Sequence, residues 1–447
     1  TTTPPTTAPP TNPPAIAYIG GVYPASSTFA AKCAVPRTGV DPLGNAYPDV
    51  SGSALAEKHF LRSWTNELYL WFNEVADLDP ASVASVSDYF KLLKTTALTP
   101  SGRNKDQFHF TYDTATYYQL STSGTSVGYG FSMALVAPAP PRRLVVEYVQ
   151  AGTQAATLGI GRGAEIISID AVDIVNNNTQ AGIDTINAAL FSPTSGSSHQ
   201  FGIRDRSGST RSLTLNATAV SFSAVPLARV LTTTSGNLGY LLFNDHTKAA
   251  EQELITAINQ LKAGNVQDLV LDLRYNGGGY IAIASELAYM IAGPSRTGGK
   301  TFEALQYNSK RSAQNQATPF YDSSTQNQAL PTLNLGRVYV LTGSGTCSAS
   351  ESIINSLQGV DVTVQRIGAT TCGKPYGFQA RDNCGISYFP IEFQGVNAKG
   401  WGDYASGFTP TCTVADDLEH GLGDAAEARL AAALTLRTTG VCPPGSD

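Results

Sequence analysis

The sequence predicts a multi-domain protein of the α/β class. After Val220, strand-like apolar runs alternate with segments of helical periodicity, from "GNLGYLLFN" and "AAEQELITAINQLKAG" to "SASESIINSLQG" and "VTVQRIG". Such alternation is typical of a largely parallel sheet covered by helices. Two different textures precede it, and 447 residues exceed what one ordinary core needs. We therefore expect three folded domains, the last over residues 226–442.

A helical domain is predicted over residues 50–115. Apolar side chains recur at helical spacing from residue 54 to residue 93. One face of the first helix is expected to carry Leu61, Trp64, Leu68, Trp71 and Val75. We interpret this aromatic stripe as a core or a domain contact rather than a ligand site.

Short strands dominate residues 124–220. The runs "YGFSMALV", "RRLVVEYV", "AEIISID", "HQFGIRD" and "RSLTLNAT" are separated by Gly, Pro and Asn, and one helix is expected at residues 183–190. These features predict a β-rich second domain.

Composition excludes several classes of function. The chain has 29 basic and 35 acidic residues without a basic stripe, which argues against nucleic acid as a partner. No apolar run is long enough to cross a membrane. Residues 1–20 are rich in Thr and Pro, and we interpret them as an extended linker, either a disordered tail or a spacer that tethers the protein to a surface.

Six cysteines are scattered without metal-site spacing and favour disulfides in an oxidising compartment. Their proximity in the sequence predicts that Cys372 pairs with Cys384 and that Cys412 pairs with Cys442. The five histidines are dispersed, and His246, at the end of a predicted strand, is interpreted as structural. We expect neither a metal nor a nucleotide cofactor.

Three motif-like strings lack the structural context that their chemistry needs. "GTSVG" at residues 124–128 precedes a strand, whereas a nucleophile elbow leads into a helix. "GIGRGA" from Gly159 also precedes a strand, and "GATTCGKP" has Pro375 where a phosphate-binding loop needs Ser or Thr. We therefore expect no active site at these strings.

Two turns at strand ends favour acyl-transfer chemistry instead. In "LVLDLRYNGGG", three glycines follow a buried strand, and their N–H groups could converge on an oxyanion, although a tight turn would explain them equally well. In "GTCSASESIINSL", Ser348 stands at the start of a helix, where N–H groups and the helix dipole stabilise negative charge. Ser348 is thus the candidate nucleophile. Cys347 is the weaker alternative, since it belongs to an even set of cysteines and has no adjacent base.

A base for Ser348 is found in "TTCGKPYGF", where Lys374 follows the next strand. A lysine acts as a base only when burial lowers its pKa, and a shift from about 10.4 to about 7–8 costs roughly 3–5 kcal/mol. The apolar neighbours of Lys374 could provide that burial.

Together, "DLRYNGGG", "SASE" and the "GK" that follows resemble the S41 family of carboxyl-terminal processing or tail-specific serine peptidases. The resemblance implies a catalytic core of the ClpP/crotonase type. It implies Ser348 as nucleophile, Lys374 as general base, and the N–H groups of Gly278 and Ala349 as the oxyanion hole. It also implies that Gln379 orients the lysine, although the interval from Ser348 to Lys374 is one residue longer than the family's usual spacing.

The second domain resembles a PDZ module, which often accompanies such peptidases. "GYGF", formed by Gly128, Tyr129, Gly130 and Phe131, resembles the loop that binds a peptide's terminal carboxylate. The resemblance implies a secreted or periplasmic serine endopeptidase that acts on unfolded or carboxyl-terminal protein segments. The alternatives are a catalytically silent peptide-binding protein on the same fold and an esterase or amidase that uses the same dyad.

Overall fold

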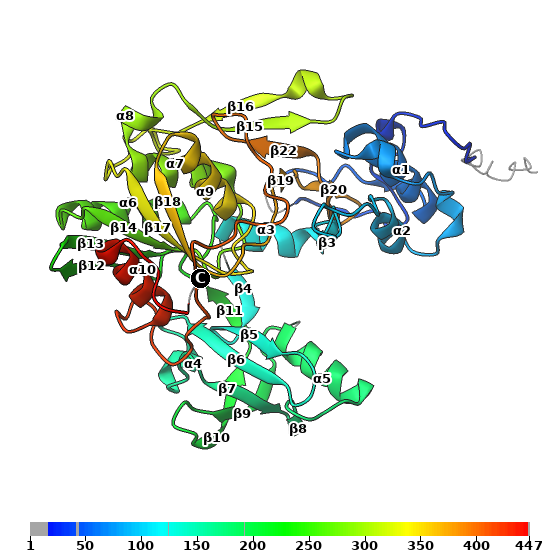
Figure 1. The fold of residues 1–447 in the computed structure, drawn as a ribbon. Helices are drawn as coiled ribbons and strands as arrows, with labels where there is room; N and C mark the ends of the chain where they lie inside the picture. The colour runs from blue at the N-terminus through cyan, green and yellow to red at the C-terminus, as the bar shows by residue number, and fades with distance from the viewer. Residues whose placement is uncertain (1–16, 42–43, 124, 192, 446–447) are drawn as a thin grey trace, which may run out of the picture. The chain divides into compact units, whose positions relative to one another are not determined.

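The computed structural model describes residues 17–41, 44–123, 125–191 and 193–445, so most of the predicted linker over residues 1–20 lies outside the described residues. The chain divides into two compact units (Figure 1). The smaller unit combines the N-terminal segment up to Ala115 with two later segments, Tyr307–Gln314 and Phe378–Phe393. The larger unit contains the rest of the chain.

The smaller unit is built on helix α1, Ala54–Leu68. Ser53 caps its start by accepting a hydrogen bond from the Ala56 N–H, and its buried face packs against the second helix. The remaining elements are η1 (Ser26–Thr28), β1 (Lys32–Cys33), β2 (Val50–Ser51), η2 (Phe72–Glu74), η3 (Pro80–Ser82), α2 (Val86–Leu92), β3 (Phe110–Asp113), β20 (Arg381–Asn383) and β21 (Ile386–Phe389). Strands β20, β21 and β3 form an antiparallel sheet, and β1 pairs with β2.

Helix α1 is shorter than the aromatic stripe predicted. It ends at Leu68 because Tyr69 adopts extended backbone angles, so Trp71 and Val75 follow the helix rather than extend its face. Leu61, Trp64 and Leu68 are buried in this unit's core, as the stripe predicted. Val75, although outside the helix, still packs against the same core.

The larger unit begins within α3 (Thr114–Ser123), and the strand-rich segment follows this helix. Its main sheet has the order β10-β9-β7-β6-β5, with β8 paired to β7, while β4 and β11 form a separate antiparallel pair. The elements are β4 (Thr125–Gly128), β5 (Phe131–Ala137), β6 (Arg143–Val149), α4 (Gln154–Thr157), β7 (Glu165–Ile169), β8 (Val172–Asp173), α5 (Gln180–Phe191), β9 (Ser198–Arg204), β10 (Thr210–Asn216) and β11 (Thr218–Ser221). The strands quoted from the sequence are present, and the predicted helix at residues 183–190 corresponds to α5.

The alternating part of the sequence forms a six-stranded sheet of order β12-β13-β14-β17-β18-β23. Only the β12–β13 pair is antiparallel. The elements are β12 (Leu227–Thr233), β13 (Gly236–Leu242), α6 (Ala250–Ala263), β14 (Asp268–Asp272), α7 (Ile281–Ala292), α8 (Pro294–Thr297), β17 (Arg337–Thr342), α9 (Ala349–Gly359), β18 (Thr363–Gly368), β23 (Cys412–Thr413) and α10 (Ala428–Thr439). The α/β layer predicted from alternation is confirmed.

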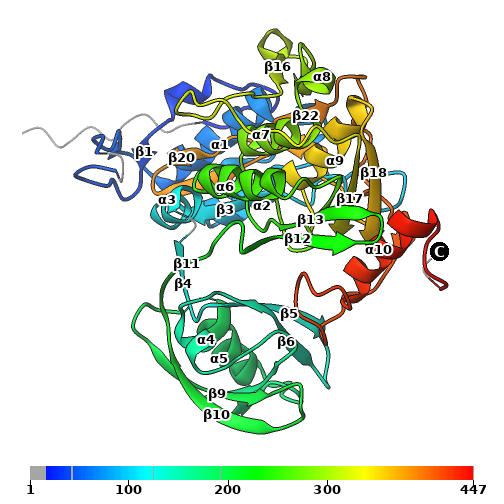
Figure 2. The ribbon, with the colours of Figure 1, turned by 90° about the vertical axis from the view of Figure 1, so that its left-hand side faces the viewer.

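Helices cover both faces of this sheet (Figure 1, Figure 2). Leu269 and Leu271 of β14 pack with α6, α7 and α9, whereas Val270 faces the side that α10 covers. Because side chains alternate along a strand, a continuous apolar strand needs cover on both faces. A further sheet of order β16-β15-β22-β19 consists of β15 (Thr301–Tyr307), β16 (Gln316–Pro319), β22 (Phe393–Val396) and β19 (Tyr376–Gly377), and η4 (Ser312–Gln314) lies in the β15–β16 connection.

Within the described ranges, no helix combines the length and the hydropathy that a bilayer crossing requires.

Candidate active site

The two turns singled out in the sequence follow neighbouring parallel strands. Strand β14 pairs with β17, with Asp272 opposite Leu341. The carboxyl ends of parallel strands lie at the same edge of a sheet, and this is where functional loops of α/β sheets gather. The glycine turn after β14 and the serine turn after β17 therefore meet.

Gly278 lies directly against the serine turn. Its φ is +97°, and a Cβ at this position would come within 2.8 Å of the Ser348 Cβ and 2.9 Å of the Ala349 nitrogen. Only glycine fits this combination of backbone angle and close approach. Gly278, Ser348 and Ala349, predicted from separate stretches, are thus brought together.

Ser348 has strained backbone angles, with φ 56° and ψ −120°, immediately before helix α9. A positive φ in a residue other than glycine costs on the order of 1–3 kcal/mol, and such strain clusters at active sites. The side chain is partly exposed, while Ala349 behind it is fully buried. Among the described residues, no acceptor is recorded for the Ala349 N–H, which is the first of the helix. The turn thus presents a hydroxyl beside an available N–H group.

Glu351 joins the nucleophile turn to the lysine loop. Its Oε2 accepts hydrogen bonds from the Ser348 N–H at 3.1 Å and from the Lys374 N–H at 2.8 Å. Its Oε1 accepts from the Thr371 hydroxyl at 2.5 Å and from the Gly373 N–H at 2.9 Å. The backbone nitrogens of Ser348 and Lys374 are therefore held on a single oxygen atom.

Lys374, the predicted base, is buried. The residue is 8% exposed and lies in the loop between β18 and β19. Glu351 is itself fully buried, and burial raises the pKa of its carboxyl although the four hydrogen bonds oppose that shift.

A disulfide joins Cys347, which precedes Ser348, to Cys372 in the loop that contains Lys374. The predicted pairing of Cys372 with Cys384 is therefore wrong, because Cys384 turns toward the N-terminal segment and binds Cys33. The predicted Cys412–Cys442 disulfide is present. With its sulfur in a disulfide, Cys347 is excluded as the nucleophile.

The same pairing removes a metal site that proximity alone would allow. Cys347, Glu351 and Cys372 offer ligand atoms within 4.8 Å of one another. Both sulfurs are bonded to each other, and both carboxylate oxygens already accept N–H or O–H donors. These residues do not fit a metal ion.

Asn276 connects the glycine turn to the serine turn. Its carbonyl oxygen accepts hydrogen bonds from the Cys347 N–H at 3.1 Å and from the Ser350 hydroxyl at 3.0 Å. Its side-chain Oδ1 accepts the Gly278 N–H at 3.0 Å. The N–H group predicted for the oxyanion hole is thus engaged within the turn. Sequence reasoning missed both Asn276 and Glu351, although each stands inside a quoted motif.

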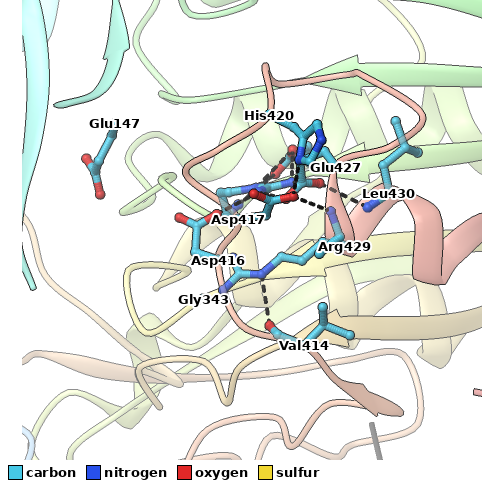
Figure 3. A network of polar contacts seen from close by, with 12 residues as sticks. Glu147, Gly343, Val414, Asp416, Asp417, His420, Glu427, Arg429 and Leu430 are labelled. Atoms are coloured by element: carbon cyan, nitrogen blue, oxygen red, sulfur yellow. Dashed lines mark hydrogen bonds and ion pairs between the residues drawn. The ribbon is translucent and has the colours of Figure 1, made fainter. Parts of the chain in front are cut away.

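A buried ionic cluster supports the start of the glycine turn. The Arg274 guanidinium binds Glu427 through two hydrogen bonds of 2.7 and 2.9 Å, and its Nε donates to Asp272 at 2.9 Å. Glu427 also caps α10 by accepting the Leu430 N–H, as Figure 3 shows. Bidentate geometry and satisfied partners are what a buried ion pair requires.

Asp416 adds a second carboxylate to this cluster. It accepts a hydrogen bond from the Arg274 guanidinium at 2.8 Å. Burial alone would raise the pKa of Asp416, but the positive charges of Arg274 and Arg429 lower it to about 2. Arg429 in turn donates to the Val414 carbonyl (Figure 3). The strand end before the glycines is therefore tied to the C-terminal part of the larger unit.

Gln379 is placed in the smaller unit, apart from the unit that contains Ser348 and Lys374. Its N–H donates to Glu392 at 3.1 Å, and it lines a cavity of about 490 Å³ together with Trp64 and Lys310. Its predicted role in orienting the lysine stays a prediction.

The predicted peptide-binding loop lies at the edge of the first sheet of the larger unit. Gly128 ends β4, Phe131 begins β5, and β5 is the last strand in the sheet order. Gly130 has a φ of +88°, and a Cβ there would meet Thr153 at 2.4 Å. Tyr129 is buried and donates its hydroxyl to the Ala189 carbonyl at 2.8 Å. The loop is thus fixed next to an edge strand.

Comparison with known proteins identifies the central segment. The model of peptidase family S41 matches residues 237–382. A carboxyl-terminal-processing protease from Picosynechococcus sp. (strain ATCC 27264 / PCC 7002 / PR-6) is 27% identical over 270 residues, which are 57% of this chain and 56% of that protein. The alignment thus spans about half the length of this relative.

Solved structures resemble the chain over a longer range. An S41-assigned protein from Bacteroides fragilis NCTC 9343 has a TM-score of 0.66 at 24% identity, covering 88% of this chain and 98% of that one. The photosystem II D1 C-terminal processing protease has a TM-score of 0.49 at 17% identity, covering 82% and 94%. The first of these likenesses shows a shared mixed α/β fold.

Proposed function

Residues 237–382 match the model of peptidase family S41, and on that premise we propose that the chain is a serine endopeptidase that works with a dyad of Ser348 and Lys374. The observation that carries the proposal is the shared oxygen of Glu351, which holds the backbone of both residues. The strained Ser348 at the start of α9 and the burial of Lys374 support it.

In the proposed reaction, the neutral Lys374 amine takes the proton from the Ser348 hydroxyl as the oxygen attacks the peptide carbonyl. The tetrahedral oxyanion accepts hydrogen bonds from the N–H groups of Gly278 and Ala349. Lys374 then gives its proton to the leaving amine, and the C–N bond breaks. A water molecule, deprotonated by Lys374, hydrolyses the acyl-enzyme and restores Ser348.

The substrate class follows from the strand-rich segment. We place a PDZ-like domain at residues 124–220, between a helical domain at residues 50–115 and the catalytic domain at residues 226–442. The positive φ of Gly130 and the edge position of β5 support capture of a peptide that adds as a strand with its terminal carboxylate at the loop. The substrates would then be unfolded protein segments with accessible C-termini.

Three disulfides fit an extracytoplasmic location. We propose that the protein is secreted or periplasmic and that residues 1–20 act as a spacer to a surface.

The test is mass spectrometry of an unstructured protein after incubation with the full chain and, in parallel, with Ser348→Ala. New peptide termini should depend on Ser348. Ser344→Ala, which changes an exposed serine of the same loop, should cleave like the wild type. Equal cleavage by the Ser348→Ala variant would overturn the assignment of the nucleophile. Hydrolysis of ester substrates without any peptide cleavage would identify an esterase instead.

A further inference from the structure

His246, which sequence reasoning treated as structural, is bound to the glycine turn through its backbone. It lies after β13, fully buried, and forms an isolated parallel bridge with Gly279. Its carbonyl accepts the Tyr280 N–H at 3.0 Å. A Cβ on Gly279 would come within 2.8 Å of that carbonyl oxygen. Any movement of the glycine turn therefore involves His246.

The imidazole of His246 contacts the turn through Asn276. Its Nδ1 lies 2.9 Å from the Asn276 Oδ1. The orientation of this amide follows from its other partners, because its Nδ2 donates to the Phe243 carbonyl at 2.9 Å and its Oδ1 accepts from the Gly278 N–H. The His246 Nδ1 must therefore carry a hydrogen. Burial lowers the pKa of His246 to about 3, so the ring donates as a neutral group.

Asn276 Oδ1 consequently has two donors, the His246 ring and the Gly278 N–H. To stabilise an oxyanion, the Gly278 N–H must turn away from Oδ1. A buried acceptor that loses its only donor is costly, whereas one that keeps a second donor is not. The imidazole supplies that second donor.

We propose that His246 is a positioning residue for the oxyanion hole: by keeping Asn276 Oδ1 hydrogen-bonded, it allows the Gly278 N–H to be transferred to the reacting carbonyl oxygen. The proposal rests on the proposed peptidase function. His246 touches neither the substrate nor Ser348 in this role, and its effect is transmitted through Asn276.

The experiment compares His246→Leu, which removes the donor, with His246→Asn, whose amide can donate to Asn276 in place of Nδ1. Peptide hydrolysis by the full chain is measured for kcat and KM. We expect His246→Leu to lower kcat about tenfold, which corresponds to ~1.4 kcal/mol, without changing KM, and His246→Asn to retain most of kcat. A merely structural role would impair both variants alike or would lower the thermal midpoint without changing kcat.

A second readout separates failure of this proposal from failure of the peptidase assignment. Hydrogen exchange of the Gly277–Gly279 turn should be slower in His246→Leu than in the wild type, because the Gly278 N–H is then the main donor to Asn276. Exchange that is unchanged or faster, or a kcat of His246→Leu equal to that of the wild type, would overturn the role of His246. Absence of Ser348-dependent cleavage in the wild type, with exchange slowed as expected, would refute the peptidase assignment alone.

Discussion

Replacing Glu351 with glutamine should uncouple the nucleophile from the base. The carboxylate accepts two hydrogen bonds on each oxygen, from three backbone N–H groups and the Thr371 hydroxyl. Glutamine keeps one acceptor oxygen and replaces the other with an NH₂ group that can only donate. The Thr371 hydroxyl can rotate and accept from this NH₂ group, so at least one buried backbone N–H donor would face another donor.

The magnitude follows from the number of lost partners. A buried polar group left without its partner costs about 1–3 kcal/mol, so one such group destabilises the fold by that amount. The entropy of unfolding grows with chain length, and for 447 residues the thermal midpoint should fall by about 1–3 °C. Activity should fall more steeply, since a displacement of roughly 1 Å in a catalytic group can cost about a hundredfold in rate.

Thermal denaturation and kcat of the Glu351→Gln variant measure the two effects. Glu303→Gln is the matched control, because Glu303 is also buried and accepts the Ser352 hydroxyl, which a glutamine oxygen can also accept. The control should keep the wild-type activity at neutral pH, and its midpoint should not fall below that of the wild type. If Glu351→Gln also behaves like the wild type, the carboxyl is protonated in the folded protein, and the reasoning from four donors is refuted.

Two further predictions concern pH and redox state. Burial raises the pKa of Glu303 from about 4.3 to about 7, so between these pH values the unfolded chain has released a proton that the folded chain keeps, and stability falls as pH rises. Glu303→Gln should therefore have a higher thermal midpoint than the wild type at about pH 8 and the same midpoint near pH 4. The same difference between the two midpoints at both pH values would contradict this prediction. Replacing Cys347 and Cys372 with serine should cost about 3 kcal/mol of stability and should also lower kcat. Replacing Cys412 and Cys442, whose disulfide closes a loop of similar length, should lower only the thermal midpoint. Equal kcat in the two double variants would show that the Cys347–Cys372 disulfide does not hold the lysine loop.

Periodicity was sufficient to predict the elements that carry the site. The strand "LVLDL", the strand "VYVLT" and the helix after Ser348 are local patterns, and all three are present where the sequence predicts them. Because parallel strands present their carboxyl ends at one edge, local patterns also indicate that the glycine turn and Ser348 can meet. The choice of Gly278 and Ala349 among the residues of these turns came from the resemblance to the S41 family and not from the local patterns.

Long-range links could not be read from sequence spacing. Cys33 and Cys384 are 351 residues apart, and nothing local indicates that residues 378–393 return to the N-terminal unit. The pairing of Cys372 with its nearest neighbour in sequence failed for this reason. The end of α1 at Leu68 was also missed, since the apolar spacing continues beyond the last helical residue.

Glu351 and Asn276, which connect the turns of the site, were missed for a related physical reason. The side chains of Glu351 and Asn276 form hydrogen bonds with backbone N–H and C=O groups. Nearly every residue has these groups, so no side-chain pattern in the sequence predicts the partners. A charged residue on the inner face of an apolar helix is the one available signal, because an acid is rarely buried without partners. Glu351 in "SASESII" fits that description.

The links around the nucleophile act on the same two segments in different ways. The Cys347–Cys372 disulfide limits how far the serine turn and the lysine loop can separate, whereas Glu351 sets the orientation of the peptide groups of Ser348 and Lys374 within that limit. Loss of Glu351 should therefore disturb the alignment of Ser348 and Lys374 while the two segments stay together. We expect a large loss of kcat and a modest fall of the thermal midpoint. Loss of the disulfide leaves the four hydrogen bonds to maintain the alignment, and its effect on kcat should be the smaller of the two. Both restraints act on Ser348, whose positive φ is a strained conformation that persists only where the surrounding structure holds it.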